Sequence, residues 1–191
     1  MYYHASATKG IKELRPSVSN HKIPLIYFSS KRENTLVYLS NAIEKYCKEQ
    51  NFAYDGVYTT WAPYSFDINS VLVIEEYYPN ALQETYKGIS GYIYYVNKID
   101  NIKRQLDIPY AFVTDSCVKT DGYEYINDAY DAILDEEKKG TIKVVRYEEF
   151  IKIKKEWLYQ IIRKEYNNPS ISPEYKFFLE NKFGDIINCK A

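Results

Sequence analysis

Cysteine and histidine are scarce in this chain, with three and two residues respectively out of 191. Cys47, Cys117 and Cys189 lie about seventy residues apart, so no pair has the close spacing of metal ligands. An odd number of cysteines also argues against a disulfide framework. The sequence therefore predicts reduced thiols, no metal site and a cytoplasmic location.

Long apolar runs are missing as well. No stretch approaches the roughly 20 apolar residues that span a bilayer, and residues 1–10 lack the apolar segment of a secretory signal. We therefore expect neither membrane insertion nor secretion. The 25 basic and 26 acidic residues nearly cancel, so the net charge does not indicate nucleic-acid binding, which would need a local basic patch.

Two familiar nucleotide-binding motifs are also absent. The chain has neither a G-x-G-x-x-G segment nor a Walker loop, so the standard dinucleotide and P-loop folds lack their fingerprints. Tyrosine, in contrast, is unusually frequent at 22 residues. These rings could form a base-stacking surface. Because most lie at periodic positions, we favour a place in the core or at its rim, with the hydroxyl reaching water.

Apolar periodicity predicts an interleaved set of strands and helices. Short apolar or β-branched runs predict strands at residues 1–4, 23–28, 71–75, 91–96 and 141–145, with one or two more between 110 and 120. Helical spacing and capping residues predict helices at 31–49, 79–88, 126–138, 147–166 and 172–184. Residues 51–70 show no period and are expected to form a long loop. Several strands lie close together, which favours an α+β sheet over a doubly wound one.

Two of these helices carry specific expectations. Ser30 and Glu33 have the S-x-x-E spacing of a capping box, which predicts one continuous helix over 31–49. In the 147–166 helix, four apolar residues recur at helical spacing and are expected to face inward. They are Phe150, Ile153, Trp157 and Ile161.

The two histidines differ in their surroundings. His4 ends the first predicted strand and is followed by small residues, so its imidazole could reach into a cleft and bind a ligand hydroxyl. A histidine at the rim of the sheet, without a role, is the alternative. His21 lies in a polar stretch and is expected in a solvated loop.

Several short segments together resemble a known superfamily. Residues 3–6 (Tyr-His-Ala-Ser), 14–16 (Leu-Arg-Pro) and 26–30 (Ile-Tyr-Phe-Ser-Ser) are similar in order and type to motifs of the ADP-ribosyltransferase-like proteins. The layout most resembles the small bacterial rifamycin ADP-ribosyltransferases, which carry His-Gly-Thr on the first strand and Tyr-Phe-Thr on the second. Their later Ile-Tyr-x-Val strand is similar to residues 92–96. The resemblance covers roughly residues 2–120.

This resemblance implies a fold and a domain division. We expect an α+β domain over residues 1–146, with a split mixed sheet and flanking helices. Residues 147–191 would form a helical C-terminal extension packed on it, for which the superfamily offers no counterpart.

The resemblance also implies NAD as a substrate. His4 matches the position that binds a ribose hydroxyl, and Tyr27 matches the one that stacks on nicotinamide. The neighbouring positions implied for the cofactor site are Ala5, Ser6, Ser29 and Tyr38. Ala5 and Ser6 replace the family's Gly-Thr, and a β-carbon at position 5 narrows the approach of a ligand to the backbone.

Catalysis in such a family needs an acidic residue as well. Departure of nicotinamide leaves a cationic ribose, which a carboxylate and an aromatic platform stabilise. Asp115 is the first choice for this residue, Glu124 the second and Asp107 the third, although none lies in a family motif. Three functions remain open: NAD-dependent ADP-ribosyl transfer to an unknown acceptor, non-catalytic binding of a nucleotide or protein on the same fold, and an unrelated function without an NAD site.

Overall fold

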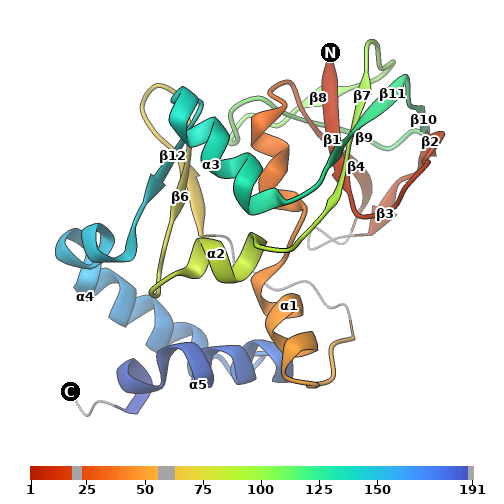
Figure 1. Ribbon diagram of the computed structural model, residues 1–191. Coiled ribbons are helices and arrows are strands. Elements are labelled where there is room, and N and C mark those ends of the chain that lie inside the picture. The colour runs from red at the N-terminus through yellow and green to blue at the C-terminus, as the bar shows by residue number, and fades with distance from the viewer. Residues whose placement is uncertain (19–22, 56–62, 189–191) are drawn as a thin grey trace.

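The computed structural model describes residues 1–18, 23–55 and 63–188. His21 and Cys189 lie outside these ranges. Over the described residues the chain is a mixed α+β structure with three sheets and five α-helices (Figure 1). No helix within those ranges is both long enough and apolar enough to cross a membrane.

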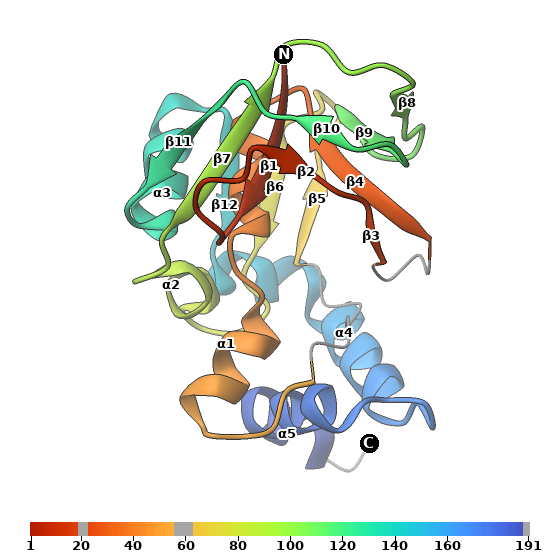
Figure 2. The ribbon, with the colours of Figure 1, turned by 90° about the vertical axis from the view of Figure 1, so that its right-hand side faces the viewer.

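The largest sheet has the strand order β11-β7-β1-β4-β9-β8, with β3 pairing beside β4. Its strands are β1 (Tyr2–Ser6), β3 (Ser17–Val18), β4 (Pro24–Ser29), β7 (Gly91–Val96), β8 (Lys103–Arg104), β9 (Ala111–Thr114) and β11 (Gly122–Ile126). All of its pairs are antiparallel. β1 pairs with β7 over five positions but with β4 only at Tyr3↔Ser29. Beyond that point β1 and β4 diverge (Figure 2).

Two smaller sheets flank the main one. Behind it lie β5 (Tyr64–Phe66), β6 (Leu72–Glu75) and β12 (Ile142–Val145), in which β12 and β6 run parallel. In front of it lie β2 (Glu13–Leu14) and β10 (Val118–Lys119), paired antiparallel. We call the face of the main sheet turned to the viewer in Figure 2 the front face, and the opposite one the back face.

The back face is sealed by apolar packing. Side chains alternate between the faces of a strand, so Ile93 and Ile126 point backward together. They pack in one core with the short 3₁₀ helix η1 (Glu33–Tyr38), helix α3 (Ala129–Lys139) and strands β6 and β12. The front face has a smaller core, beneath β2 and β10, which contains Leu14, Ile26 and Phe28.

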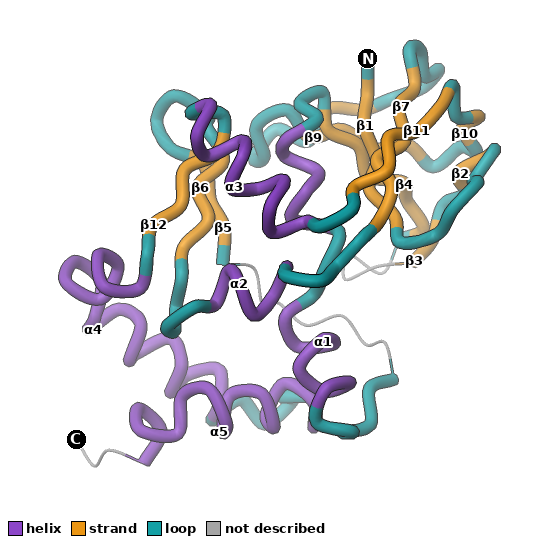
Figure 3. The backbone as a smooth tube through the Cα atoms, viewed as in Figure 1, coloured by secondary structure: helices purple, strands orange, loops and turns teal. Residues whose placement is uncertain are grey.

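The remaining helices form a separate layer at one end of the molecule (Figure 3). They are α1 (Ala42–Glu49), α4 (Tyr147–Tyr166) and α5 (Pro173–Asn188), while α2 (Ala81–Tyr86) lies between this layer and the back-face core and packs in both. Their core contains Ile43, Phe150, Leu158 and Phe178, all nearly inaccessible to solvent. Helix α5 begins as expected, because the Ser172 hydroxyl accepts a hydrogen bond from the Tyr175 N–H at 3.4 Å, but it continues past Gly184.

The predicted strands at 23–28, 71–75, 91–96 and 141–145 are confirmed, whereas the single helix over 31–49 is wrong. The chain forms η1 and then α1, because the Asn41 side chain accepts hydrogen bonds from the N–H groups of Ile43 and Glu44 and so starts a new helix. The proposed capping box is also absent, since η1 starts at Glu33 and the residue before it, Arg32, makes no side-chain cap. Strands β5, within the predicted loop, and β11 have no counterpart among the predicted strands.

Helix α4 has its predicted length but only part of its predicted inward face, since Phe150 and Ile161 pack in the helical core and the other two residues do not. Ile153 is 80% exposed and Trp157 is 44% exposed, although Phe150 is buried as expected. The backbone at Lys154 is not helical (φ −121°, ψ 21°), which shifts the phase of the helix. Past this kink the buried residues are Leu158 and Ile162.

Candidate functional site: a hollow between β1 and β4

A hollow of about 400 Å³ lies where β1 and β4 diverge, under β2 and β3. Its wall is formed by His4, Ile11, Glu13, Leu14, Arg15, Ser17, Val18, Leu25, Ile26 and Tyr27. This volume lies within the range of pockets that hold small molecules and cofactors. The wall thus includes His4 and Tyr27, the two residues that the sequence singled out, although their side chains point to opposite faces of the sheet.

The imidazole of His4 has a defined tautomer. Its Nδ1 lies 2.9 Å from the carbonyl oxygen of Tyr27. A carbonyl oxygen can only accept, so Nδ1 carries the proton and donates it. Burial lowers the pKa of His4 below its ordinary value, and the hydrogen bond to Tyr27 offsets only part of this effect. The ring is therefore neutral at neutral pH, and the lone pair of Nε2 is left without a donor among the described residues.

Tyr27 reaches this hollow differently from His4. Tyr3 pairs with Ser29, so strand alternation places the Tyr27 side chain on the back face, with that of Tyr3. His4 lies on the front face, where its ring centroid is 5.9 Å from that of Phe28. Tyr27 therefore offers the hollow its main chain. The stacking role implied for its ring stays a prediction.

The other residues implied for the cofactor site do not line the hollow. Ala5 packs against the back-face core. The Ser6 hydroxyl accepts from the Thr8 N–H at 3.1 Å, and the buried Ser29 hydroxyl accepts from the Lys31 N–H at 3.0 Å. Both serines therefore stabilise turns. Tyr38 is 54% exposed on η1 and packs edge-on against the ring of Tyr64.

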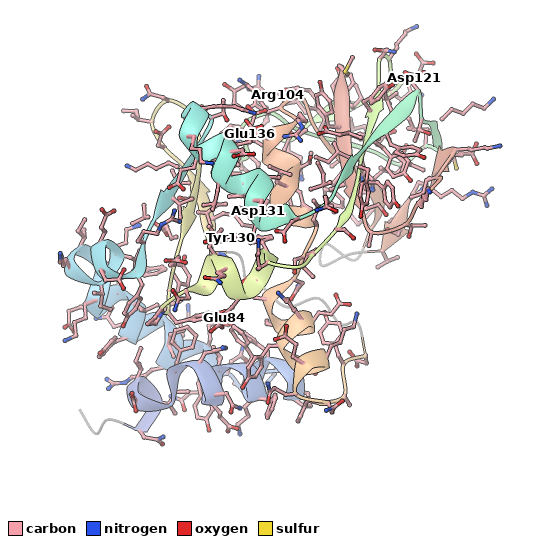
Figure 4. The ribbon with its side chains drawn as sticks, in the orientation of Figure 1. Glu84, Arg104, Asp121, Tyr130, Asp131 and Glu136 are labelled. Atoms are coloured by element: carbon pink, nitrogen blue, oxygen red, sulfur yellow. The ribbon has the colours of Figure 1, made fainter. Side chains whose placement is uncertain are left out.

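None of the three acidic residues proposed from the sequence lines the hollow either. Asp107 and Asp115 are exposed. Glu124 forms a two-pronged ion pair with Arg32, with N–O distances of 2.8 and 2.7 Å. Arg32 also reaches Glu136 at 3.0 Å. Glu136 lies on α3 (Figure 4). This arrangement explains Glu124 as a tether between β11, the start of η1 and α3.

Sequence reasoning assigned no role to two charged residues that do line the hollow. Glu13 and Arg15 lie on either side of the buried Leu14, and their side chains form an ion pair at 3.3 Å. Both are substantially exposed, so the contact is a weak one that a ligand could replace. The sequence pattern that could have revealed them is the alternation of charged and apolar residues over 13–15. In an extended segment this alternation places both charged side chains on the same side.

No protein-family model matches the chain, and no curated protein or solved structure matches it significantly. No cluster of three or more metal-ligating side chains occurs in the part of the chain that the structure describes. The function must therefore be inferred from the geometry of the hollow and from the superfamily resemblance of the sequence.

Proposed function

We propose that the chain binds a nucleotide, with NAD as the first candidate, in the hollow between β1 and β4. The observation that carries this proposal is the neutral, fixed imidazole of His4. Its Nε2 can accept a hydrogen bond from a ribose hydroxyl, while the bond from Nδ1 to Tyr27 holds the ring in place. The guanidinium of Arg15 supplies the charge and the planar donors that suit a phosphate.

Binding has more support than catalysis. ADP-ribosyl transfer to an unknown acceptor is the activity that the resemblance implies, and it needs a carboxylate beside the ribose. Asp115 and Glu124 lie elsewhere, so Glu13 takes this place in the proposal. A nucleotide-binding module without transfer activity is the second candidate function, favoured by the absence of Asp115 and Glu124 from the wall of the hollow.

The first experiment is a thermal-shift titration with NAD up to millimolar concentration. Ligand at 100 times its dissociation constant stabilises a protein by about 2.7 kcal/mol, so the melting temperature should rise. His4→Gln should abolish most of this rise, because a glutamine whose amide nitrogen donates to the Tyr27 carbonyl does not hold its acceptor oxygen at the position of the imidazole Nε2. Asp115→Asn, an exposed change outside the hollow, is the matched control and should respond like the wild type.

Two results would contradict the proposal. One is no rise in melting temperature for NAD, ADP-ribose or AMP with the wild-type protein. The other is an equal rise for His4→Gln and wild type, which would place the nucleotide elsewhere. Release of nicotinamide from NAD, compared between wild type and Glu13→Gln, then separates transfer from binding alone.

A further inference from the structure

A cluster of tyrosines lies on the front face of β7 and β11. Tyr123 pairs with Tyr94 and Tyr125 pairs with Tyr92, so all four side chains point to the same side. The ring centroid of Tyr92 lies 5.3 Å from those of both Tyr123 and Tyr125. Tyr94 is fully buried, whereas Tyr123 is 44% exposed and Tyr125 is 52% exposed. We call Tyr92, Tyr123 and Tyr125 the front tyrosines.

Packing in a core does not account for the position of these rings. The front of β11 and the adjoining part of β7 is not covered by any helix or strand within the described residues (Figure 2). On the same strands, the backward-pointing Ile93 and Ile126 are almost completely buried. Neighbouring aromatic rings that stay exposed on a sheet form the kind of surface on which flat ligands stack.

Three lysines lie around this cluster. The Tyr94 hydroxyl donates to the Thr8 carbonyl at 2.7 Å and accepts from the Ile11 N–H at 3.0 Å, which holds the loop carrying Lys9 against the cluster. Lys12 and Lys119 lie on the backbone that leads into β11, since the Lys12 carbonyl accepts from the Thr120 N–H, two residues before β11 begins.

Both signs of charge occur near the cluster: Glu13 pairs with Lys119 across β2 and β10, and Asp121 precedes β11, against three lysines. Lys9, Lys12 and Lys119 are exposed, and none forms an ion pair within the described part of the chain. The carboxylate of Asp121, at the start of β11 in Figure 4, already accepts a hydrogen bond from the Asn97 N–H at 2.7 Å. Open aromatic rings bordered by unpaired cations match a ligand that is both flat and anionic.

We propose that the front tyrosines and these three lysines bind single-stranded nucleic acid. Bases would stack on Tyr123 and Tyr125, and phosphates would lie near the lysines. Stacking needs no particular base, because every base has an aromatic face. The near-zero net charge of the chain does not oppose this, since the lysines form a local patch. The proposal does not depend on the nucleotide hollow at His4.

The test is fluorescence anisotropy with labelled twelve-nucleotide oligo-dT and oligo-U. The wild-type protein should bind at low salt. The double variant Tyr123→Ala, Tyr125→Ala should bind at least about fivefold more weakly, since stacking contributes about 1–3 kcal/mol per base. The double variant Tyr123→Phe, Tyr125→Phe keeps both rings and should retain nearly wild-type affinity. Circular dichroism checks that each variant is folded.

A triple lysine variant tests the charge separately. Affinity falls as the salt concentration rises, and the slope of log affinity against log salt concentration measures how many phosphates are neutralised. Changing Lys9, Lys12 and Lys119 to alanine should make this slope shallower by about 0.7 for each phosphate that a lysine no longer neutralises. The matched control removes three exposed lysines of α4, which also lack ion pairs with described residues and lie in the separate helical layer. These are Lys152, Lys155 and Lys164, and their removal should leave affinity and slope almost unchanged.

Several outcomes would overturn the proposal. They are the absence of oligonucleotide binding at high micromolar protein, equal binding by the two tyrosine double variants, and an equal loss of affinity in the control lysine variant. Self-association of the wild type that the alanine double variant abolishes, without oligonucleotide binding, would assign the surface to a protein contact instead. His4→Gln should bind oligonucleotides normally, so a failure of the NAD proposal remains distinguishable from a failure of this one.

Discussion

The front and back faces of the main sheet can be compared on the same two strands. On β7 and β11 the backward-pointing Ile93 and Ile126 are 1% and 4% exposed, whereas the forward-pointing Tyr123 and Tyr125 are 44% and 52% exposed. Neighbouring residues on one strand thus meet different surroundings, because side chains alternate between its two faces. Stability and binding can therefore be altered independently by choosing residues one position apart.

The largest effect should come from the back face. Ile133 on α3 is completely buried in the core against that face. Ile133→Ala should lower the free energy of unfolding by about 2–5 kcal/mol, because it removes buried methyl groups and leaves a cavity. Tyr125→Ala on the front face should lower it by only about 0.5–1.5 kcal/mol, the contribution of its contact with the Tyr92 ring. Urea denaturation of both variants measures the contrast, and equal losses would mean that the front tyrosines belong to the core.

A smaller effect on stability is expected for Glu124. It lies between Tyr123 and Tyr125 in sequence, but its side chain is on the back face and forms an ion pair with Arg32. Glu124→Gln should cost about 0.5–1 kcal/mol of stability, a value kept low because the Glu124 side chain is 49% exposed. The rise in melting temperature with NAD should be unchanged. A stable Glu124→Gln protein that no longer responds to NAD would restore Glu124 as a pocket residue, and Asp115→Asn provides the comparison.

The smallest effect concerns the pH dependence at His4 on the front face. Burial lowers the pKa of His4 below the 6.5 of an unperturbed histidine, so the unfolded chain binds a proton more readily than the folded one. This contribution to stability is complete above pH 6.5 and is lost as the pH falls from there through the folded pKa. Urea midpoints at about pH 7.5 and about pH 5 should therefore differ more for wild type than for His4→Gln. Identical differences would show that His4 titrates alike in both states.

The sequence predicted elements well where local signals agreed. The helix predicted over 126–138 is present as α3, which Gly140 ends in a left-handed conformation, although it begins only at Ala129, because Asp128 caps it through hydrogen bonds from the N–H groups of Tyr130 and Asp131. Within residues 31–49, however, the apolar spacing continued across a break, and Asn41 restarted the helix. The kink at Lys154 had no local signal either, and it moved Ile153 and Trp157 out of the core.

The site was predicted in part for a similar reason. His4 was singled out as the end of a strand over 1–4, but β1 continues to Ser6 and His4 lies in its middle, so the local pattern found the residue and misplaced the strand end. The true partner of Glu124 is Arg32, 92 residues away, and a contact at that distance leaves no trace in the periodicity. Glu13 and Arg15 lie at the hollow because β1 and β4 pair at one position only and then diverge, which depends on the whole sheet.

The parallel pairing of β6 with β12 has a consequence for how the chain folds. Leu72 pairs with Ile142, so every residue of β7 and β11 lies within the loop that this pairing closes. Contacts between residues so far apart in sequence form slowly, because the entropy of closing the loop is lost before the contact is made. During synthesis, β6 would remain without its parallel neighbour until most of the chain had left the ribosome. Helices α4 and α5 follow β12 directly, so we expect their docking on α1 to be among the last steps of folding.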